Sequence, residues 1–242
     1  MRRRFKRDLP FRKIVPNMIT SGSVLCGFLA LALCYYDRFL PAAWLVGVAV
    51  IFDYMDGRVA RMLGGSSDFG VELDSLADAL SFGAVPAFMT YSAYVGLEGG
   101  LIGALSGAFF TLCGVLRLAR FNVTHVVGPF QGLPIPAAGL TLVSFVMGGI
   151  YIPWWAASAL MAVLGGLMVS RVPYGNLKKV HRGDLNRLRA TALLVTLGVV
   201  SVVLKERAPV VLCFTYVLSG PVGLDWGRWL VKKESVEAEG KI

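Results

Sequence analysis

Residues 39–63 read FLPAAWLVGVAVIFDYMDGRVARML, and this stretch decides the fold class. No charged residue occurs in it before Asp53, and the run is long enough for a helix that crosses a bilayer, which needs about 20 mostly apolar residues. Asp53, Asp56, Arg58 and Arg61 then follow within a few turns. The stretch therefore predicts a transmembrane helix that brings a charged end to one membrane surface.

Apolar runs of similar length fill most of the chain, which has 242 residues, 56% of them apolar and 16% charged. This composition is unlike that of a soluble domain and predicts an all-α fold, a polytopic membrane helix bundle with about eight transmembrane helices. We expect residues 1–230 to form a single membrane domain and residues 231–242 a polar cytoplasmic tail. The candidate helices are 17–36, 39–63, 69–95, 99–121, 134–151, 153–170, 190–205 and 208–224.

The net charge of +9 raises the question of a nucleic-acid partner, so the distribution of basic residues matters. If both termini are cytoplasmic, only Arg38, Lys205 and Arg207 of the 24 Lys and Arg residues fall in outside turns. This bias follows the positive-inside rule and explains the charge through topology and attraction to anionic lipid. We therefore expect a multi-pass protein of the cell (inner, cytoplasmic) membrane, with membrane lipid and no nucleic acid as partner. A cleaved signal peptide is the alternative for the basic N-terminus, but the apolar run that follows is too long for one.

Four aspartates stand out because most of the other membrane segments are free of acids. On a helix, residues at i, i+3, i+4, i+7 and i+8 form one stripe. Two antiparallel helices joined by the Gly-Ser turn at 64–67 can therefore face four carboxylates towards one another. The first stripe comprises Asp53, Asp56, Gly57, Ala60 and Arg61, and the second comprises Gly70, Asp74 and Asp78.

Grouped carboxylates at membrane depth require compensation. Insertion scales assign roughly 2.5 to 3.5 kcal/mol to each aspartate, so four cost on the order of 10 kcal/mol before their mutual repulsion. Bound metal relieves this cost, and carboxylate oxygens suit Mg²⁺ or Mn²⁺, two of which can clamp a phosphate chain. The alternative is a buried network of aspartates and arginines, as in a transporter or proton relay. The small residues Gly57, Ala60 and Gly70 fit either close helix packing or the close approach of a bulky ligand.

The segment DYMDGRVAR at 53–61, followed by GVELDSLAD at 70–78, resembles the complete signature of the CDP-alcohol phosphatidyltransferase family. All eight fixed residue types of that signature, spread over 26 positions, match. The signature covers two of the expected helices, and the membrane profile of the rest is also what the family implies. The resemblance implies that Asp53, Asp56, Asp74 and Asp78 ligate two Mg²⁺ or Mn²⁺ ions that bridge a pyrophosphate. It further implies that Asp78 is the catalytic base on the acceptor hydroxyl.

The resemblance also implies a CDP-lipid site and a homodimer. Without the family, Asn17 and Thr20 fit a helix cap and interface residues equally well. The small-residue run at 103–107 is a candidate for a helix interface between protomers. The expected CDP-lipid contacts are Asn17, Thr20, Gly57, Ala60, Arg61, Ser67 and Gly70.

Segments 82–87, 117–122 and 131–138 resemble the phosphatidylserine synthase branch of this family. Arg117 and Arg120 lie at i and i+3 at an expected cytoplasmic helix end, where a guanidinium can receive the carboxylate of serine as a two-pronged pair. The alternative is that both arginines snorkel to lipid phosphates and fix the topology. The candidate acceptor-binding residues are therefore Arg117, Arg120 and Asn122, and the role of Asn122 is open.

Taken together, the resemblance implies an enzyme that transfers a phosphatidyl group from CDP-diacylglycerol to L-serine and yields phosphatidylserine and CMP. One alternative keeps this chemistry with glycerol 3-phosphate or an inositol compound as the acceptor. A different class is a cation-coupled membrane transporter that uses the aspartates as an ion path, which predicts ion binding without release of CMP. A third is a catalytically silent, lipid-binding member of the family.

Overall fold

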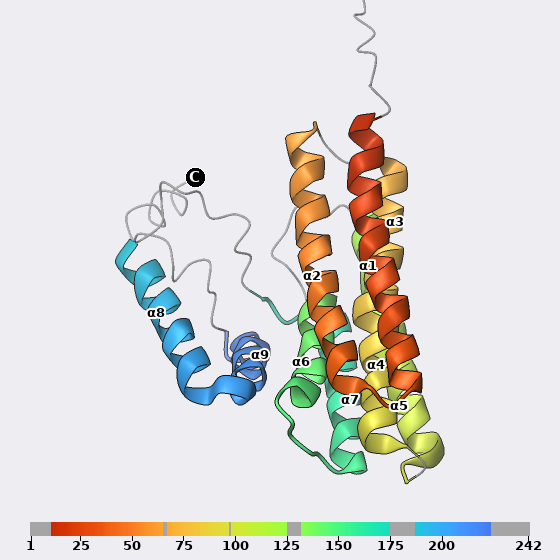
Figure 1. The fold of residues 1–242 in the computed structure, drawn as a ribbon, viewed down its shortest axis with the longest axis vertical. Coiled ribbons are helices and arrows are strands. Elements are labelled where there is room, and N and C mark those ends of the chain that lie inside the picture. The colour runs from red at the N-terminus through yellow and green to blue at the C-terminus, as the bar shows by residue number, and fades with distance from the viewer. Residues whose placement is uncertain (1–10, 65–66, 97, 125–131, 175–186, 224–242) are drawn as a thin grey trace, which may run out of the picture.

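The computed structural model describes residues 11–64, 67–96, 98–124, 132–174 and 187–223, and every element in these ranges is helical (Figure 1). The all-α prediction is confirmed for this part of the chain. The tail predicted at 231–242 lies outside the described residues. The elements are α1 (Phe11–Tyr35), α2 (Phe39–Met62), α3 (Asp68–Asp78), the π-helix η1 (Ala79–Ala84), α4 (Val85–Thr90), the π-helix η2 (Tyr91–Val95), α5 (Gly100–Thr124), α6 (Ile135–Met147), α7 (Trp154–Val169), α8 (Arg187–Leu204), the 3-10 helix η4 (Lys205–Arg207) and α9 (Ala208–Ser219).

Within the described residues, three helices are long and apolar enough to cross a membrane: Ile14–Tyr35, Phe39–Met62 and Gly100–Val123. Helices α6 and α7 are apolar but shorter. Large apolar side chains cover the outer surface; Phe28, Trp44 and Leu101 are 64%, 62% and 74% exposed. Such exposure is unfavourable in water and expected against lipid tails. The structure therefore supports a membrane protein, while the prediction of about eight transmembrane helices goes beyond these three spans.

Helices α1, α2 and α3 stand side by side, and the end of α2 and the beginning of α3 lie at the same end of the bundle as the start of α1 (Figure 1). Small residues permit close packing, because Ala30 on α1 and Ala42 and Ala49 on α2 are fully buried. Gly64 follows α2 with φ +108°, a conformation that glycine adopts readily, and this confirms the first residue of the predicted turn.

Residues 68–95 form one helical segment in which α-helical and π-helical turns alternate. The π-helix η1 begins directly after Asp78. Helical turns of the π type are rare in proteins, and those that occur are often found at functional sites. Ser81 on η1 donates a 3.0 Å hydrogen bond to the carbonyl of Ser23 on α1. On the α6 side, a Cβ added at Gly139 would lie 2.5 Å from the carbonyl oxygen of Phe82. Contacts with α1 and α6 therefore fix the chain that follows Asp78.

In the second half of the chain, α5 packs along α7 and α6 along α9, while α8 lies to one side against α9 and η4 (Figure 1). Gly103 and Gly107 on α5 are buried within the protomer. A Cβ added at Gly103 would overlap Cγ1 of Val95, and one added at Gly107 would lie 3.8 Å from Sδ of Met161. The prediction of an interface between protomers at residues 103–107 is therefore wrong for these two glycines, because they face η2 and α7 of their own chain.

Candidate active site

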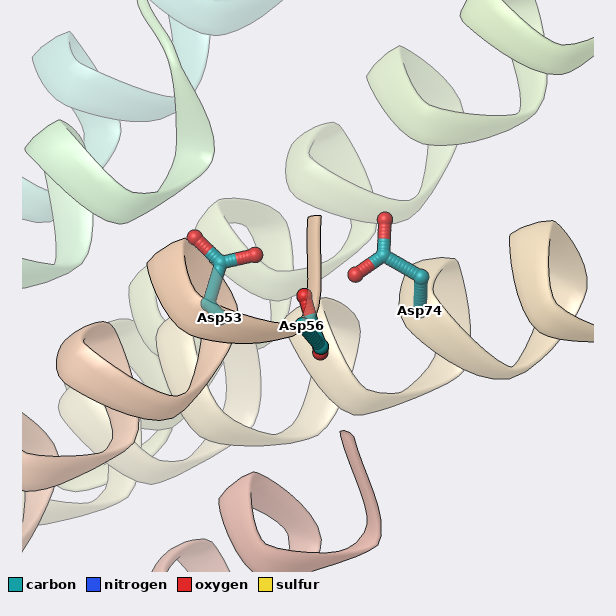
Figure 2. A group of neighbouring side chains, drawn as sticks. All are labelled: Asp53, Asp56 and Asp74. Atoms are coloured by element: carbon teal, nitrogen blue, oxygen red, sulfur yellow. The ribbon is translucent and has the colours of Figure 1, made fainter. Parts of the chain in front are cut away.

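Three carboxylates meet between α2 and α3. Asp53 and Asp56 lie one turn apart on α2, and Figure 2 shows Asp74 of α3 facing them. One oxygen from each of the three carboxylates lies within 4.8 Å of the other two. Asp56 is 4% exposed, and Asp53 and Asp74 are half-buried. The two predicted stripes therefore do converge at these three residues.

Asp78, one turn beyond Asp74 on α3, is half-buried and belongs to the same electrostatic environment. Its carboxyl group interacts electrostatically with the other three aspartates and with the guanidinium of Arg117 on α5. Four carboxylates at such range repel one another, so positive charge is needed to hold them together. Arg117 supplies part of that charge and has a second electrostatic partner in Tyr216 on α9.

A hydrogen bond from α1 orients Asp56. The hydroxyl of Thr20 donates to Oδ2 of Asp56 at 2.6 Å, and both side chains are buried. A short bond to a charged acceptor is among the stronger hydrogen bonds in proteins, and it restricts how the carboxylate can turn. Because α1 begins at Phe11, Thr20 and Asn17 lie inside the helix. The helix-cap interpretation of both residues is wrong, and Thr20 lies at the contact between α1 and α2.

Asn17, Ser67 and Gly70 meet where α1 approaches the start of α3. The Oγ atom of Ser67 accepts a 3.1 Å hydrogen bond from the backbone N–H of Gly70 and so caps α3. A Cβ added at Gly70 would lie 2.9 Å from Oδ1 of Asn17, which is closer than real Cβ atoms come. Gly70 therefore lies close to α1 at this point, which fits close helix packing, and both interpretations of this glycine stay predictions.

Gly57 on α2 has different surroundings. A Cβ added there would meet Nη1 of Arg61 at 3.5 Å, an ordinary van der Waals distance. Packing inside the chain therefore does not require a glycine at this position, which favours the close approach of a ligand. Arg61 is exposed with its guanidinium next to Gly57, and Ala60 between them is 7% exposed.

The three candidate acceptor residues at the end of α5 face different partners. Arg117 is half-buried and faces Asp78, whereas Arg120 is exposed. Asn122 donates through Nδ2 to Oγ of Ser75 at 3.0 Å and to Oε2 of Glu72 at 3.5 Å, both on α3. The structure therefore brings Arg117 to the acidic cluster and connects Asn122 to the helix that carries Asp74.

The chemistry of the cluster suits a hard cation. Within the described residues it offers carboxylate oxygens, without thiol or imidazole ligands, and this donor set is the one that Mg²⁺ and Mn²⁺ prefer. A buried carboxylate such as that of Asp56 is costly unless it is paired or hydrogen-bonded, so a divalent ion bound among the three carboxylates would add to the stabilisation that the Thr20 hydroxyl gives. Asp53, Asp56 and Asp74 could therefore hold such an ion, with Asp78 beside them.

Sequence reasoning missed two groups near the site. Ser75 follows Asp74 directly, so a search for polar residues that flank the acidic stripe could have found it. Tyr216 lies far along the chain, on α9, and no sequence motif connects it to Arg117. Its ring is 5.8 Å from that of Tyr174, whose hydroxyl donates to the carbonyl of Val217 at 3.0 Å. These contacts hold Tyr216 in place.

Comparison with known proteins agrees with this site. The family model for CDP-alcohol phosphatidyltransferases matches residues 13–170, which include every site residue discussed above except Tyr174 and Tyr216. The chain belongs to the CDP-alcohol phosphatidyltransferase family.

Several relatives cover about two thirds of the chain or more. The chain is 39% identical to a CDP-diacylglycerol–serine O-phosphatidyltransferase of Helicobacter pylori over 69% of this chain and 74% of that protein. It is 38% identical to the protein of the same name from Bacillus subtilis, over 68% of this chain and 92% of the relative. An archaetidylserine synthase of Methanothermobacter thermautotrophicus is 40% identical over 66% of this chain and 69% of its own length.

Proposed function

We propose that the protein is a CDP-diacylglycerol–serine O-phosphatidyltransferase, an integral membrane enzyme of phospholipid biosynthesis that makes phosphatidylserine and CMP from CDP-diacylglycerol and L-serine. The convergence of Asp53, Asp56 and Asp74 within 4.8 Å carries this proposal, because it supplies a cation site of the kind that pyrophosphate chemistry needs. Family membership and the names of the relatives supply the substrates.

Two divalent ions, Mg²⁺ or Mn²⁺, are proposed for the cluster. Asp53, Asp56, Asp74 and Asp78 would hold them, and the ions would supply positive charge against the pyrophosphate of the CDP-lipid. Thr20 would keep Asp56 in a fixed orientation through the hydrogen bond to Oδ2. Arg117 would balance part of the remaining negative charge around Asp78.

Asp78 is proposed as the base. Its carboxylate would take the proton of the serine hydroxyl while that oxygen forms a bond to the phosphatidyl phosphorus, and the bond from this phosphorus to CMP would break. The proton would then reside on Asp78 and CMP would leave with the electron pair of the broken bond. The position of Asp78, beside the cluster and in the field of Arg117, supports this role.

The remaining candidate residues divide into two subsites. The CDP-lipid side would comprise Asn17, Thr20, Gly57, Ala60, Arg61, Ser67 and Gly70. Gly57 is the best supported of these residues, because a Cβ would fit at this position within the chain and a glycine stands there nonetheless. On the acceptor side, Arg117 faces Asp78 and would receive the serine carboxylate, with Arg120 nearer the surface.

We further propose that residues 1–230 form one membrane domain with about eight spans in the cytoplasmic membrane, both termini in the cytoplasm, and that the protein is a homodimer. The charge bias supports the orientation. Labelling of a cysteine introduced at residue 2 or at residue 206, in intact cells and in a variant whose four native cysteines are replaced, tests it. Residue 206 should react with an impermeant reagent and residue 2 should not.

The proposed function is tested by CMP release. Detergent-purified protein receives CDP-diacylglycerol and Mg²⁺ or Mn²⁺, with serine, glycerol 3-phosphate or inositol as the acceptor. Release that depends on serine is the expected result. Release of CMP with another acceptor would keep the proposed chemistry but change the acceptor substrate. Metal binding without release of CMP in any mixture would favour the transporter or the silent lipid-binding protein.

A further inference from the structure

Helix α3 carries Asp74 and Asp78 and is held from two directions. On one side, Gly70 lies against Asn17 of α1. On another, Ser75 contacts Asn122 near the end of α5. Because Ser75 neighbours Asp74 in sequence and lies one turn before Asp78, the contact with α5 is made in the same turn of α3 that presents the two aspartates.

The amide of Asn122 and the hydroxyl of Ser75 lie within hydrogen-bond distance of each other. Nδ2 of Asn122 donates to Oγ of Ser75 at 3.0 Å, and the Ser75 hydroxyl donates to the carbonyl of Val71 at 3.1 Å. Oδ1 of Asn122 lies 3.4 Å from the same Oγ atom, and Oε2 of Glu72 lies 3.5 Å from Nδ2. The amide of Asn122 is therefore engaged with α3, which leaves it poorly placed to bind a small acceptor.

We infer that Asn122 and Ser75 form a lock that sets the rotation of α3 and so positions Asp74 and Asp78 opposite Asp53 and Asp56. This inference rests on the proposed function, because it assigns the lock a task in the proposed metal site. Ser75 and Asn122 are positioning residues in this role. Asn122 is then no ligand of serine, in contrast to its place among the candidate acceptor residues.

Small rotations of α3 matter for such a site. A helix with its side chains has a radius of about 5 to 6 Å, so a rotation of roughly 10° moves a carboxylate by about 1 Å. A displacement of that size is enough to cost about a hundredfold in rate when it misplaces a catalytic group. The contact with α1 at Gly70 lies at the start of α3, so the Ser75–Asn122 pair acts closer to the two aspartates.

The lock is tested by a Mn²⁺ binding titration of detergent-purified protein in the presence of CDP. Electron paramagnetic resonance measures the concentration of the free ion. Ser75→Ala and Asn122→Ala each remove one partner, and the double variant completes a cycle. Ser75→Thr keeps the hydroxyl and should bind Mn²⁺ as the wild type does. Ser106→Ala is the matched control, because Ser106 also lies on α5 but its hydroxyl donates to the carbonyl of Ile102 in its own helix.

We expect each single alanine variant to weaken Mn²⁺ binding by about threefold to tenfold, and the double variant to be no weaker than the worse single one. The serine KM should stay within about twofold of the wild type while kcat falls. A lowered melting temperature with an unchanged Mn²⁺ dissociation constant would reduce the pair to a structural contact and overturn the inference. A rise in serine KM alone would return Asn122 to the acceptor site and overturn it as well.

The test also separates this inference from the proposed function. If wild-type protein releases no CMP but the variants still lose Mn²⁺ affinity, the lock stands and the proposed reaction fails. If wild-type protein releases CMP and both alanine variants bind Mn²⁺ normally, the reaction stands and the lock fails.

Discussion

Thr20 on α1 holds Asp56 on α2 through a hydrogen bond of 2.6 Å from its hydroxyl to Oδ2, and both side chains are only 4% exposed. Asp56 is buried, and its orientation depends on a helix outside the acidic signature. The site consequently spans α1, α2 and α3, although the motif that predicts it covers only α2 and α3.

Removal of the Thr20 hydroxyl should loosen Asp56. Thr20→Val keeps the shape of the side chain but leaves a buried carboxylate oxygen without its donor, so Mn²⁺ affinity should fall by about tenfold. Thr20→Ser retains the hydroxyl and serves as the control. Titration of both variants with Mn²⁺ checks the prediction, and equal affinities for Val and Ser would show that the hydrogen bond does not orient the site.

Gly57→Ala separates packing from ligand approach. The added Cβ meets Nη1 of Arg61 at 3.5 Å, and alanine favours a helix over glycine by about 1 kcal/mol, so the melting temperature should hold or rise. The KM for CDP-diacylglycerol should nevertheless increase if the lipid lies against this face. Gly47→Ala on the same helix is the control, because its Cβ would lie 3.7 Å from Cε of Met147 and should leave the KM unchanged. An unchanged KM in Gly57→Ala would remove Gly57 from the proposed subsite.

Asp78→Asn tests the proposed base. The amide is nearly isosteric but cannot take the proton of the acceptor hydroxyl, so turnover should fall by at least about a hundredfold. Binding of CDP in the presence of Mn²⁺ should remain measurable, because Asp53, Asp56 and Asp74 are intact. Turnover close to that of the wild type would exclude Asp78 as the base.

Much of the fold and the acidic cluster followed from the sequence for physical reasons. Long apolar runs can satisfy their backbone groups in lipid only as helices or closed barrels, and the i, i+3, i+4 spacing of Asp53, Asp56 and Gly57 selects a helix. Gly64 then allows the reversal that brings Asp74 to face them. Each of these steps depends on local chemistry that is visible in one or two segments.

Other features depended on contacts between distant segments and could not be predicted. The sequence does not show that Thr20 would reach Asp56, or that Gly103 would lie against Val95 rather than a second protomer. The division of roles at the end of α5 is similar. Arg117 and Asn122 belong to one motif, yet packing turns the first towards Asp78 and the second towards Ser75.

That division leads to a prediction for the two arginines. Arg117 is half-buried beside Asp78, so a serine carboxylate paired with it would be partly shielded from water, whereas Arg120 is exposed. Arg117→Ala should raise the serine KM by about tenfold or more, and Arg120→Ala should raise it less. Because Arg117 also opposes the charge of the acidic cluster, its removal should leave Mn²⁺ affinity unchanged or higher. Steady-state kinetics for both substrates together with a Mn²⁺ titration measure these effects. A parallel rise in the KM values for serine and CDP-diacylglycerol in both variants would mean that the arginines contact lipid phosphates. A loss of Mn²⁺ affinity in Arg117→Ala would mean that Arg117 supports the structure of the site and does not bind the acceptor.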